Sequence, residues 1–125
     1  MVFLDTHALL LFHQGDRSLL SEQAISLFDE ADALLISPIV LLETQYLKEI
    51  GRIRFSADTV FQQMSALYEL QLEEKGFAQA IWKALEYSWT RDPFDRVITA
   101  HASLFEAVLL TKDQLIQQHY PRAVW

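Results

Sequence analysis

Residues 2–12, VFLDTHALLLF, combine a short apolar run, a single acidic residue and an apolar helix-like segment. The run Val2–Leu4 is typical of a buried strand, and Thr6–His13 is predicted to form a helix directly after it. Asp5 stands between the two, where the predicted strand ends. An ionised carboxylate among apolar residues is costly unless it is hydrogen-bonded, paired or metal-bound, so Asp5 is predicted to be a helix cap, part of a site, or both.

Strand-like and helix-like segments alternate along the whole chain, with only three Gly, three Pro and no interdomain linker. Further strands are predicted over Ala33–Ile36, Leu70–Leu72, Val108–Leu110 and Ala123–Val124. Helices are predicted from Ser21 to Ala31, from Ser37-Pro38 to a stop at Gly51, over Ala57–Tyr68 and Gly76–Leu85, from Asp92-Pro93 to Glu106, and over Gln114–Gln118. This alternation predicts one α/β domain over residues 1–125, a three-layer α/β/α sandwich around a mainly parallel central sheet.

The composition excludes several classes of protein. Ten Lys and Arg against seventeen Asp and Glu give a net charge of -7, which argues against a protein that coats nucleic acid non-specifically. It argues less against a metallonuclease, whose clustered carboxylates contribute to the surplus. The absence of cysteine excludes disulfides and thiolate-bound metals. No apolar run approaches the roughly 18–20 residues of a membrane span, and no basic leader precedes the first strand, so a cytoplasmic location is expected.

Glu43 is the acidic residue that local structure explains least. On a helix with 100° per residue, Glu43 lies in the middle of an apolar face, with Thr44 and Lys48 on the opposite side. The other members of that face are Ile39, Tyr46, Leu47 and Ile50. A glutamate in this position is predicted to be buried, either in a structural ion pair or in a site.

Asp95 and Asp113 also stand at element boundaries, and each has a purely structural interpretation as well. Asp92 is predicted to cap the helix that begins at the following proline. Asp95 is then its third residue, at the edge of the apolar face, where a carboxylate can project into a cleft. Asp113 follows the strand Val108–Leu110 and has the right position to cap the short helix after it.

Together the acidic residues predict one site, because open α/β sheets bind ligands at the carboxyl ends of their strands. Clustered carboxylates are the ligands that hard divalent cations prefer. The candidate metal ligands are Asp5, Glu43, Asp95 and Asp113. His101 lies on an apolar helix face and is expected in the core, while His7 has no relay partner and is a secondary candidate. No nucleophile elbow or Gly-rich phosphate loop accompanies them.

Three motifs occur in an order and spacing that resemble a known family: LDTHALL at 4–10, DPFDR at 92–96 and LLTKD at 109–113. The chain resembles PIN-domain proteins, in particular the VapC-type toxin ribonucleases, over essentially its whole length. The terminal AVW resembles the closing strand of that subgroup. One departure is the helix that carries Glu43, which reads SPIVLLE where the family more often has S-x-x-S-x-W-E. This departure concerns packing rather than ligands.

The resemblance implies a metal-dependent endoribonuclease that cleaves single-stranded or looped RNA through a water activated by Mg²⁺ or Mn²⁺. Carried over by position, the acidic metal ligands of the family are Asp5, Glu43, Asp95 and Asp113, and Thr111 matches a catalytic-site hydroxyl residue. Arg91, Arg96 and Lys112 lie near these acids in sequence and are candidates to guide the phosphate.

The resemblance also implies partners. We expect an RNA substrate, a cognate antitoxin whose basic fragment enters the acidic site, and a homodimer, with no membrane partner. The candidate dimer surfaces are Phe12–Phe28 and Phe55–Tyr68, which are rich in large apolar residues.

Two other enzyme classes fit less well, and one non-enzyme alternative remains. Acidic α/β phosphatases place a second Asp two residues after the first, where this chain has His7. A phospho-acceptor receiver domain needs paired acids at its first strand, which this chain lacks. The alternative is a PIN fold that keeps its acids and serves as a binding or scaffold module.

Overall fold

A computed structural model describes all residues, 1–125, and has one five-stranded sheet at its centre. The sheet has the order β3-β2-β1-β4-β5, and every neighbouring pair of strands is parallel. The strands are β1 (Val2–Leu4), β2 (Leu34–Ile36), β3 (Gln71–Leu72), β4 (Val108–Leu110) and β5 (Ala123–Val124). The mainly parallel sheet expected from the sequence is therefore confirmed, and it is parallel throughout.

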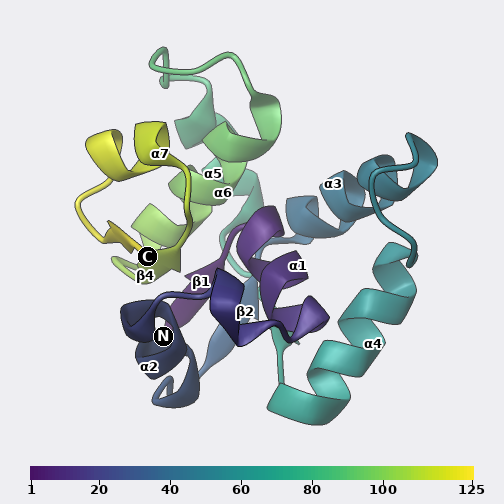
Figure 1. Ribbon diagram of the computed structural model, residues 1–125. Coiled ribbons are helices and arrows are strands. Elements are labelled where there is room, and N and C mark those ends of the chain that lie inside the picture. The colour runs from purple at the N-terminus through teal and green to yellow at the C-terminus, as the bar shows by residue number, and fades with distance from the viewer.

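Helices connect the strands and cover both faces of the sheet (Figure 1). They are α1 (Thr6–Gln14), the short 3₁₀ helix η1 (Arg17–Leu19), α2 (Glu22–Asp29), α3 (Pro38–Glu49), α4 (Ala57–Tyr68), α5 (Phe77–Ala84), α6 (Pro93–Leu104) and α7 (Gln114–His119). The connections from β1 toward β3 and from β4 to β5 run in opposite directions across the sheet. Connections of the usual right-handed form then place their helices on opposite faces. Helix α3 contacts α1 and α4 on one side and α6 on the other. The result is the α/β/α sandwich that the sequence predicts.

The register of the central strand aligns the carboxyl ends of its neighbours. Phe3 of β1 pairs with Leu35 of β2 on one side and with Leu109 of β4 on the other. All three side chains are buried in the main core, because strands covered on both faces need apolar residues at successive positions. The residues that follow β1, β2 and β4 consequently meet at one edge of the sheet, beside the ends of α3 and α6.

Three aspartates begin helices as the sequence predicts. Asp5 caps α1 by accepting a hydrogen bond from the backbone N–H of Ala8 at 2.8 Å. Asp92 caps α6 and Asp113 caps α7 in the same way. Each cap uses a carboxylate oxygen, which can accept a backbone N–H while the other oxygen faces a different partner.

The buried face of α3 differs from the expected one. Glu43 is buried, as predicted, but Thr44 is buried as well, whereas Tyr46 and Ile50 are exposed. The hydroxyl of Thr44 donates to the carbonyl of Val40 at 2.7 Å, which satisfies it without water. Because α3 contacts α1, α4 and α6, its buried side is decided by these neighbours and not by its own periodicity.

Two further predictions concern the core. His101 is fully buried, as expected, and its ring nitrogens lie 2.8 Å from the Ser37 hydroxyl and from the Lys75 carbonyl. Phe12 and Phe28 stack with ring centroids 3.9 Å apart inside the core. The prediction that these two side chains belong to an exposed dimer surface is therefore wrong. No helix is long and apolar enough to cross a membrane.

Candidate functional site: an acidic pocket at the carboxyl edge of the sheet

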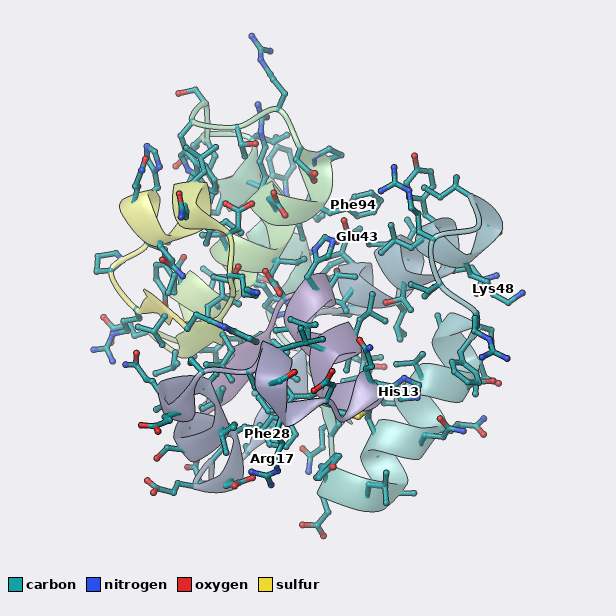
Figure 2. The ribbon with its side chains drawn as sticks, viewed as in Figure 1. His13, Arg17, Phe28, Glu43, Lys48 and Phe94 are labelled. Atoms are coloured by element: carbon teal, nitrogen blue, oxygen red, sulfur yellow. The ribbon has the colours of Figure 1, made fainter.

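One pocket brings the four candidate acids together. Its volume is about 310 Å³, and no apolar side chain lines it. The lining residues are Asp5, His7, Glu43, Asp92, Asp95, Lys112 and Asp113. Figure 2 labels Glu43 of α3 and Phe94 of α6 next to each other in its view, and these two helices contact each other. Residues separated by up to 108 positions in the chain thus line a single cavity, which is the arrangement expected from the sequence.

Asp5 is held by the central strand and the helix that follows it. Its backbone N–H donates to the Leu110 carbonyl at 3.1 Å, which continues the pairing of β1 with β4. Its side chain caps α1 and is only 4% exposed. Burial raises the pKa of Asp5, with a smaller contribution from Asp113, while the Thr111 hydroxyl, the Ala8 N–H and His7 act in the lowering direction.

Glu43 and Asp95 enter the pocket from two helices that pack together. Glu43 is 7% exposed in the middle of α3, and burial is the main cause that raises its pKa. Asp95 lies in the first turn of α6, whose start is fixed by Asp92. The Asp92 carboxylate accepts hydrogen bonds from the backbone N–H groups of Phe94 and Asp95 at 2.9 and 3.1 Å. Asp92 is therefore a helix cap, as predicted, and it also lines the pocket.

Asp113 is held by the connection between β4 and α7. It caps α7 through the N–H of Ile116 at 2.9 Å, and its own N–H donates to the hydroxyl of Thr111 at 3.0 Å. Thr111 is fully buried and does not line the pocket. Its hydroxyl interacts with both Asp5 and Asp113, which fits a residue that orients the acids.

The pocket concentrates acidic side chains, with five carboxyl groups against the single ammonium group of Lys112. The pKa of Asp95 is raised to about 8, chiefly by burial and then by the charges of Asp92, Asp113, Glu43 and Asp5, in that order. The one ion pair in the molecule joins the amino terminus to Asp32, and neither group lines the pocket. Buried carboxylates that lie near one another are stabilised when they bind protons or an added cation.

The three basic residues expected near the site are arranged differently. Lys112 lines the pocket, but Arg91 and Arg96 do not. The Nε of Arg96 donates to the carbonyl of Thr90 at 2.7 Å and so holds the loop before α6. Proximity to Asp95 in the sequence therefore does not place either arginine in the pocket: Arg96 lies on α6, where neighbouring side chains point to different sides, and Arg91 lies in the loop before the helix.

The donor chemistry of the pocket fits a hard divalent cation. Its carboxylate oxygens are the ligands that Mg²⁺ and Mn²⁺ prefer, and the buried hydroxyl of Thr6 lies close enough to Glu43 to lower the pKa of that carboxyl. No three Asp, Glu or His side chains lie close enough together, as they stand, to hold a metal ion. The residue types therefore fit a metal ion, and the acidic side chains lie farther apart in this structure than the ligands of a bound metal would.

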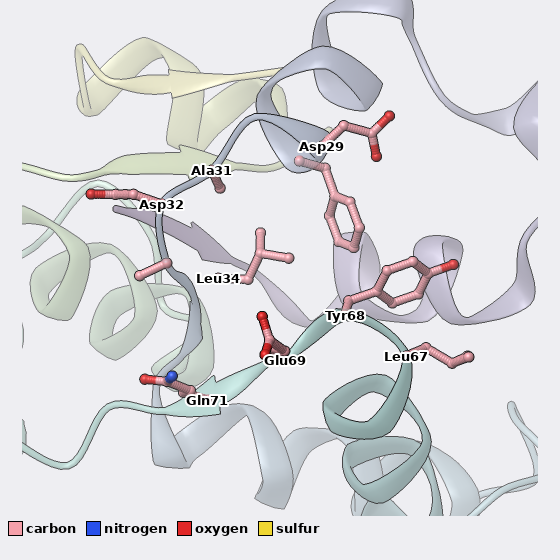
Figure 3. A pocket seen from close by; sticks show the side chains of 10 residues that line it. Asp29, Ala31, Asp32, Leu34, Leu67, Tyr68, Glu69 and Gln71 are labelled. Carbon is pink, nitrogen blue, oxygen red and sulfur yellow. The ribbon is translucent and has the colours of Figure 1, made fainter.

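A different acidic cavity lies at the opposite end of the strands, between the ends of α2 and α4, with a volume of about 370 Å³ (Figure 3). Leu34, at the start of β2, lies at its centre, with Asp29 and Tyr68 on one side and Asp32 on the other. Its acids come from exposed positions, and the pKa of Asp32 is lowered by the neighbouring amino terminus. This cavity is unlike the acidic pocket, whose buried carboxylates have raised pKa values.

Comparison with protein families gives a match to the PIN domain over residues 2–120. The chain belongs to the PIN-domain family. PIN domains are generally nucleases, and in this PIN domain the acidic pocket lies within the matched residues. No curated protein matches the chain significantly.

The PIN fold is also seen in a solved structure. A chain from the structure of FitAB bound to the IR36 DNA fragment superimposes with a TM-score of 0.56. The two sequences are 17% identical, and the match covers 100% of this PIN domain and 94% of the other chain. At this identity the likeness concerns the fold.

Proposed function

We propose that this PIN domain is a metal-dependent endoribonuclease that cleaves single-stranded or looped RNA, with Mg²⁺ or Mn²⁺ in the acidic pocket. The observation that carries the proposal is the cluster of Asp5, Glu43, Asp95 and Asp113, none of them in an ion pair, in one pocket at the carboxyl edge of a parallel sheet. Membership of the PIN-domain family supports a nuclease, and unpaired RNA is the form whose bases proteins most readily reach.

The four acids are the residues that would hold the cation, with their side chains drawn closer together than they now are. When bound, a divalent cation supplies positive charge that stabilises the phosphate in the transition state and lowers the pKa of water. Asp95, whose pKa is about 8, gives up its proton when the cation binds. Burial of Asp5 and Glu43 keeps competing water away from the carboxylates.

Two other side chains have supporting roles in the proposal. Lys112, the only Lys or Arg that lines the pocket, attracts the RNA phosphate into a region that is otherwise anionic. Thr111 acts as a positioning residue, since its hydroxyl holds the backbone of Asp113 and lies near Asp5.

The direct test is cleavage of a mixed-sequence RNA by the metal-free protein, with Mg²⁺ or Mn²⁺ added back. We expect cleavage only with metal, and its loss in Asp95→Asn. Glu49→Gln, an exposed change on α3 outside the pocket, is the matched control and should cleave like the wild type. Cleavage that continues in excess EDTA, or in Asp95→Asn, would contradict the proposal.

We further propose that the protein is the toxin of a toxin–antitoxin pair. The pocket is anionic, and an inserted Arg from a basic partner would pair bidentately with two of its carboxylates. The name of the structural neighbour, FitAB bound to DNA, supports a partner-dependent assembly. A co-purified partner should inhibit cleavage, and rising Mg²⁺ should relieve the inhibition. Inhibition that is independent of metal would exclude insertion into the pocket.

A homodimer is the assembly that we propose for the free protein. Large apolar side chains are exposed on α3, on α5 and just after α5, including Leu42 at 59%, Trp82 at 73% and Leu85 at 64%, and both helices pack on α6. Light scattering at micromolar concentration should give twice the monomer mass, and Trp82→Lys should reduce it. A monomeric wild type would contradict the dimer.

The alternative is a PIN domain that binds a partner without cleaving RNA. The observation in its favour is that no three acids are arranged to hold a metal ion. Calorimetry with Mn²⁺ separates the two functions, because a nuclease must bind the cation in the acidic pocket and a scaffold need not. Absence of Mn²⁺ binding at millimolar concentration would favour the scaffold.

A further inference from the structure

A second cavity, of about 450 Å³, adjoins the acidic pocket. The two share Lys112, which lines both. The next two residues diverge: Asp113 lines the acidic pocket and Gln114 lines the second cavity. The connection between β4 and α7 therefore separates the acidic pocket from the second cavity. An extended polymer that passes Lys112 can contact both cavities at once.

The lining of this second cavity differs sharply from that of the acidic pocket. Its polar side chains are three amides and one ammonium, and it contains no carboxylate side chain, although the protein carries a net charge of -7. The amides come from Gln23, Gln114 and Gln117, and the aromatic wall comes from Trp125. Amide groups donate and accept hydrogen bonds, which is the chemistry that reads the edges of nucleobases. Indole rings provide stacking surfaces for bases.

Two of these side chains are fixed by the core. The Nε2 of Gln117 donates to the carbonyl of Thr111 at 2.8 Å, which leaves its Oε1 available as an acceptor. Trp125 is half-buried and packs edge-on against Phe12, with ring centroids 6.2 Å apart. Lys112 Nζ lies over the Trp125 ring, 5.9 Å from its centre, so a base that stacks on this face displaces the ammonium from the ring toward the phosphate.

We infer that this cavity binds one unpaired nucleobase of the RNA, adjacent to the phosphate held at the acidic pocket. The inference rests on the proposed ribonuclease function and adds a base-reading site to it. The base stacks on Trp125, its edge meets Gln114 and Gln117, and Lys112 contacts the phosphate that joins it to the scissile linkage. A volume of about 450 Å³ is within the usual range of small-molecule sites.

Binding is tested without catalysis by nuclear magnetic resonance. The ¹⁵N-labelled, metal-free protein is titrated separately with AMP, CMP, GMP, UMP and inorganic phosphate. We expect shifts of the side-chain amide signals of Gln114 and Gln117 and of the indole N–H of Trp125, larger for one base than for the others. The indole N–H of Trp82, on exposed α5, is an internal control and should not move. Equal shifts with phosphate alone, or none with millimolar nucleotide, would overturn a base site.

Base reading is tested on a randomised single-stranded RNA pool. Gln114→Ala should reduce the wild-type preference at one position next to the cut by on the order of tenfold, the effect of losing a specific base contact. Gln118→Ala is the matched control, because Gln118 lies on the same helix, is exposed and does not line the cavity. An unchanged preference in Gln114→Ala would contradict the inference even if RNA is cleaved. If the wild type cleaves no RNA, the ribonuclease proposal fails and the titration alone decides whether the cavity binds a base.

Discussion

The hydroxyl of Thr111 accepts a hydrogen bond from the backbone N–H of Asp113 at 3.0 Å, immediately after the last residue of β4. The same hydroxyl lowers the pKa of Asp5 across the β1–β4 pair. One buried side chain therefore orients two of the pocket acids that come from distant parts of the sequence. The Gln117 side chain also donates to the Thr111 carbonyl, which connects this residue to the adjoining cavity.

The first prediction concerns that hydroxyl. Thr111→Val keeps the shape of the side chain but leaves the part-buried N–H of Asp113 without its acceptor, at a cost of about 1–3 kcal/mol. We expect a lower melting temperature and at least tenfold weaker Mn²⁺ binding by calorimetry, because Asp5 and Asp113 lose their orientation. Thr111→Ser restores the hydroxyl and should recover Mn²⁺ affinity. Equal affinity in the valine and wild-type proteins would show that Thr111 has no positioning role.

The second prediction concerns stability and pH in the absence of metal. The pKa of Asp95 is about 8 in the folded protein against an ordinary value of 3.8, so between these values the folded state binds more protons than the unfolded state. The contribution of Asp95 to the free energy of unfolding therefore falls as pH rises from about 4 to about 8. Asp95→Asn removes this dependence and should melt several degrees above the wild type at pH 8, since about 1 kcal/mol corresponds to roughly 4 °C.

Thermal melts of both proteins in EDTA at pH 5, 6, 7 and 8 check this prediction. Asp58→Asn, on the exposed side of α4, is the matched control and should follow the wild-type curve. Parallel curves for the wild type and Asp95→Asn would mean that the carboxyl of Asp95 is ionised at neutral pH.

The third prediction concerns protons released by metal. Because Asp95 is protonated at pH 7, a divalent cation must displace that proton, and the apparent Mn²⁺ affinity should rise by up to about tenfold per pH unit between pH 6 and 8. Calorimetry in two buffers of different ionisation enthalpy should register close to one proton released at pH 7. A flat affinity profile over this range would contradict the assignment of Asp95 as a ligand.

The fourth prediction separates the two roles of Asp92, which caps α6 and also lines the acidic pocket. Asp92→Ala removes the cap and should cost about 1 kcal/mol of stability, whereas Asp92→Ser keeps a capping oxygen and should melt close to the wild type. RNA cleavage by the serine variant decides whether the carboxylate does more than cap. Full activity in Asp92→Ser would assign Asp92 to helix structure alone.

Local chemistry determined most of the elements of this protein. The sequence predicts α4 over Ala57–Tyr68 and β4 over Val108–Leu110 with the bounds that the structure has. It also predicts the capping by Asp5, Asp92 and Asp113, because a cap depends on an acceptor only two or three residues from its N–H donor. The short helix η1 was not predicted, since its only signal is the Asp16 cap before a three-residue turn.

Tertiary structure alone decided which side chains meet. The order β3-β2-β1-β4-β5 places the end of β1 beside the end of β4, and no local pattern specifies that pairing. Contacts between distant segments also buried Thr44 and left Lys112 at the acidic pocket. Hydrogen bonds and side-chain periodicity act over a few residues and can be read from the sequence. The packing of distant segments depends on the whole folded chain, so the base-reading cavity formed by α2, α7 and β5 became visible only in the structure.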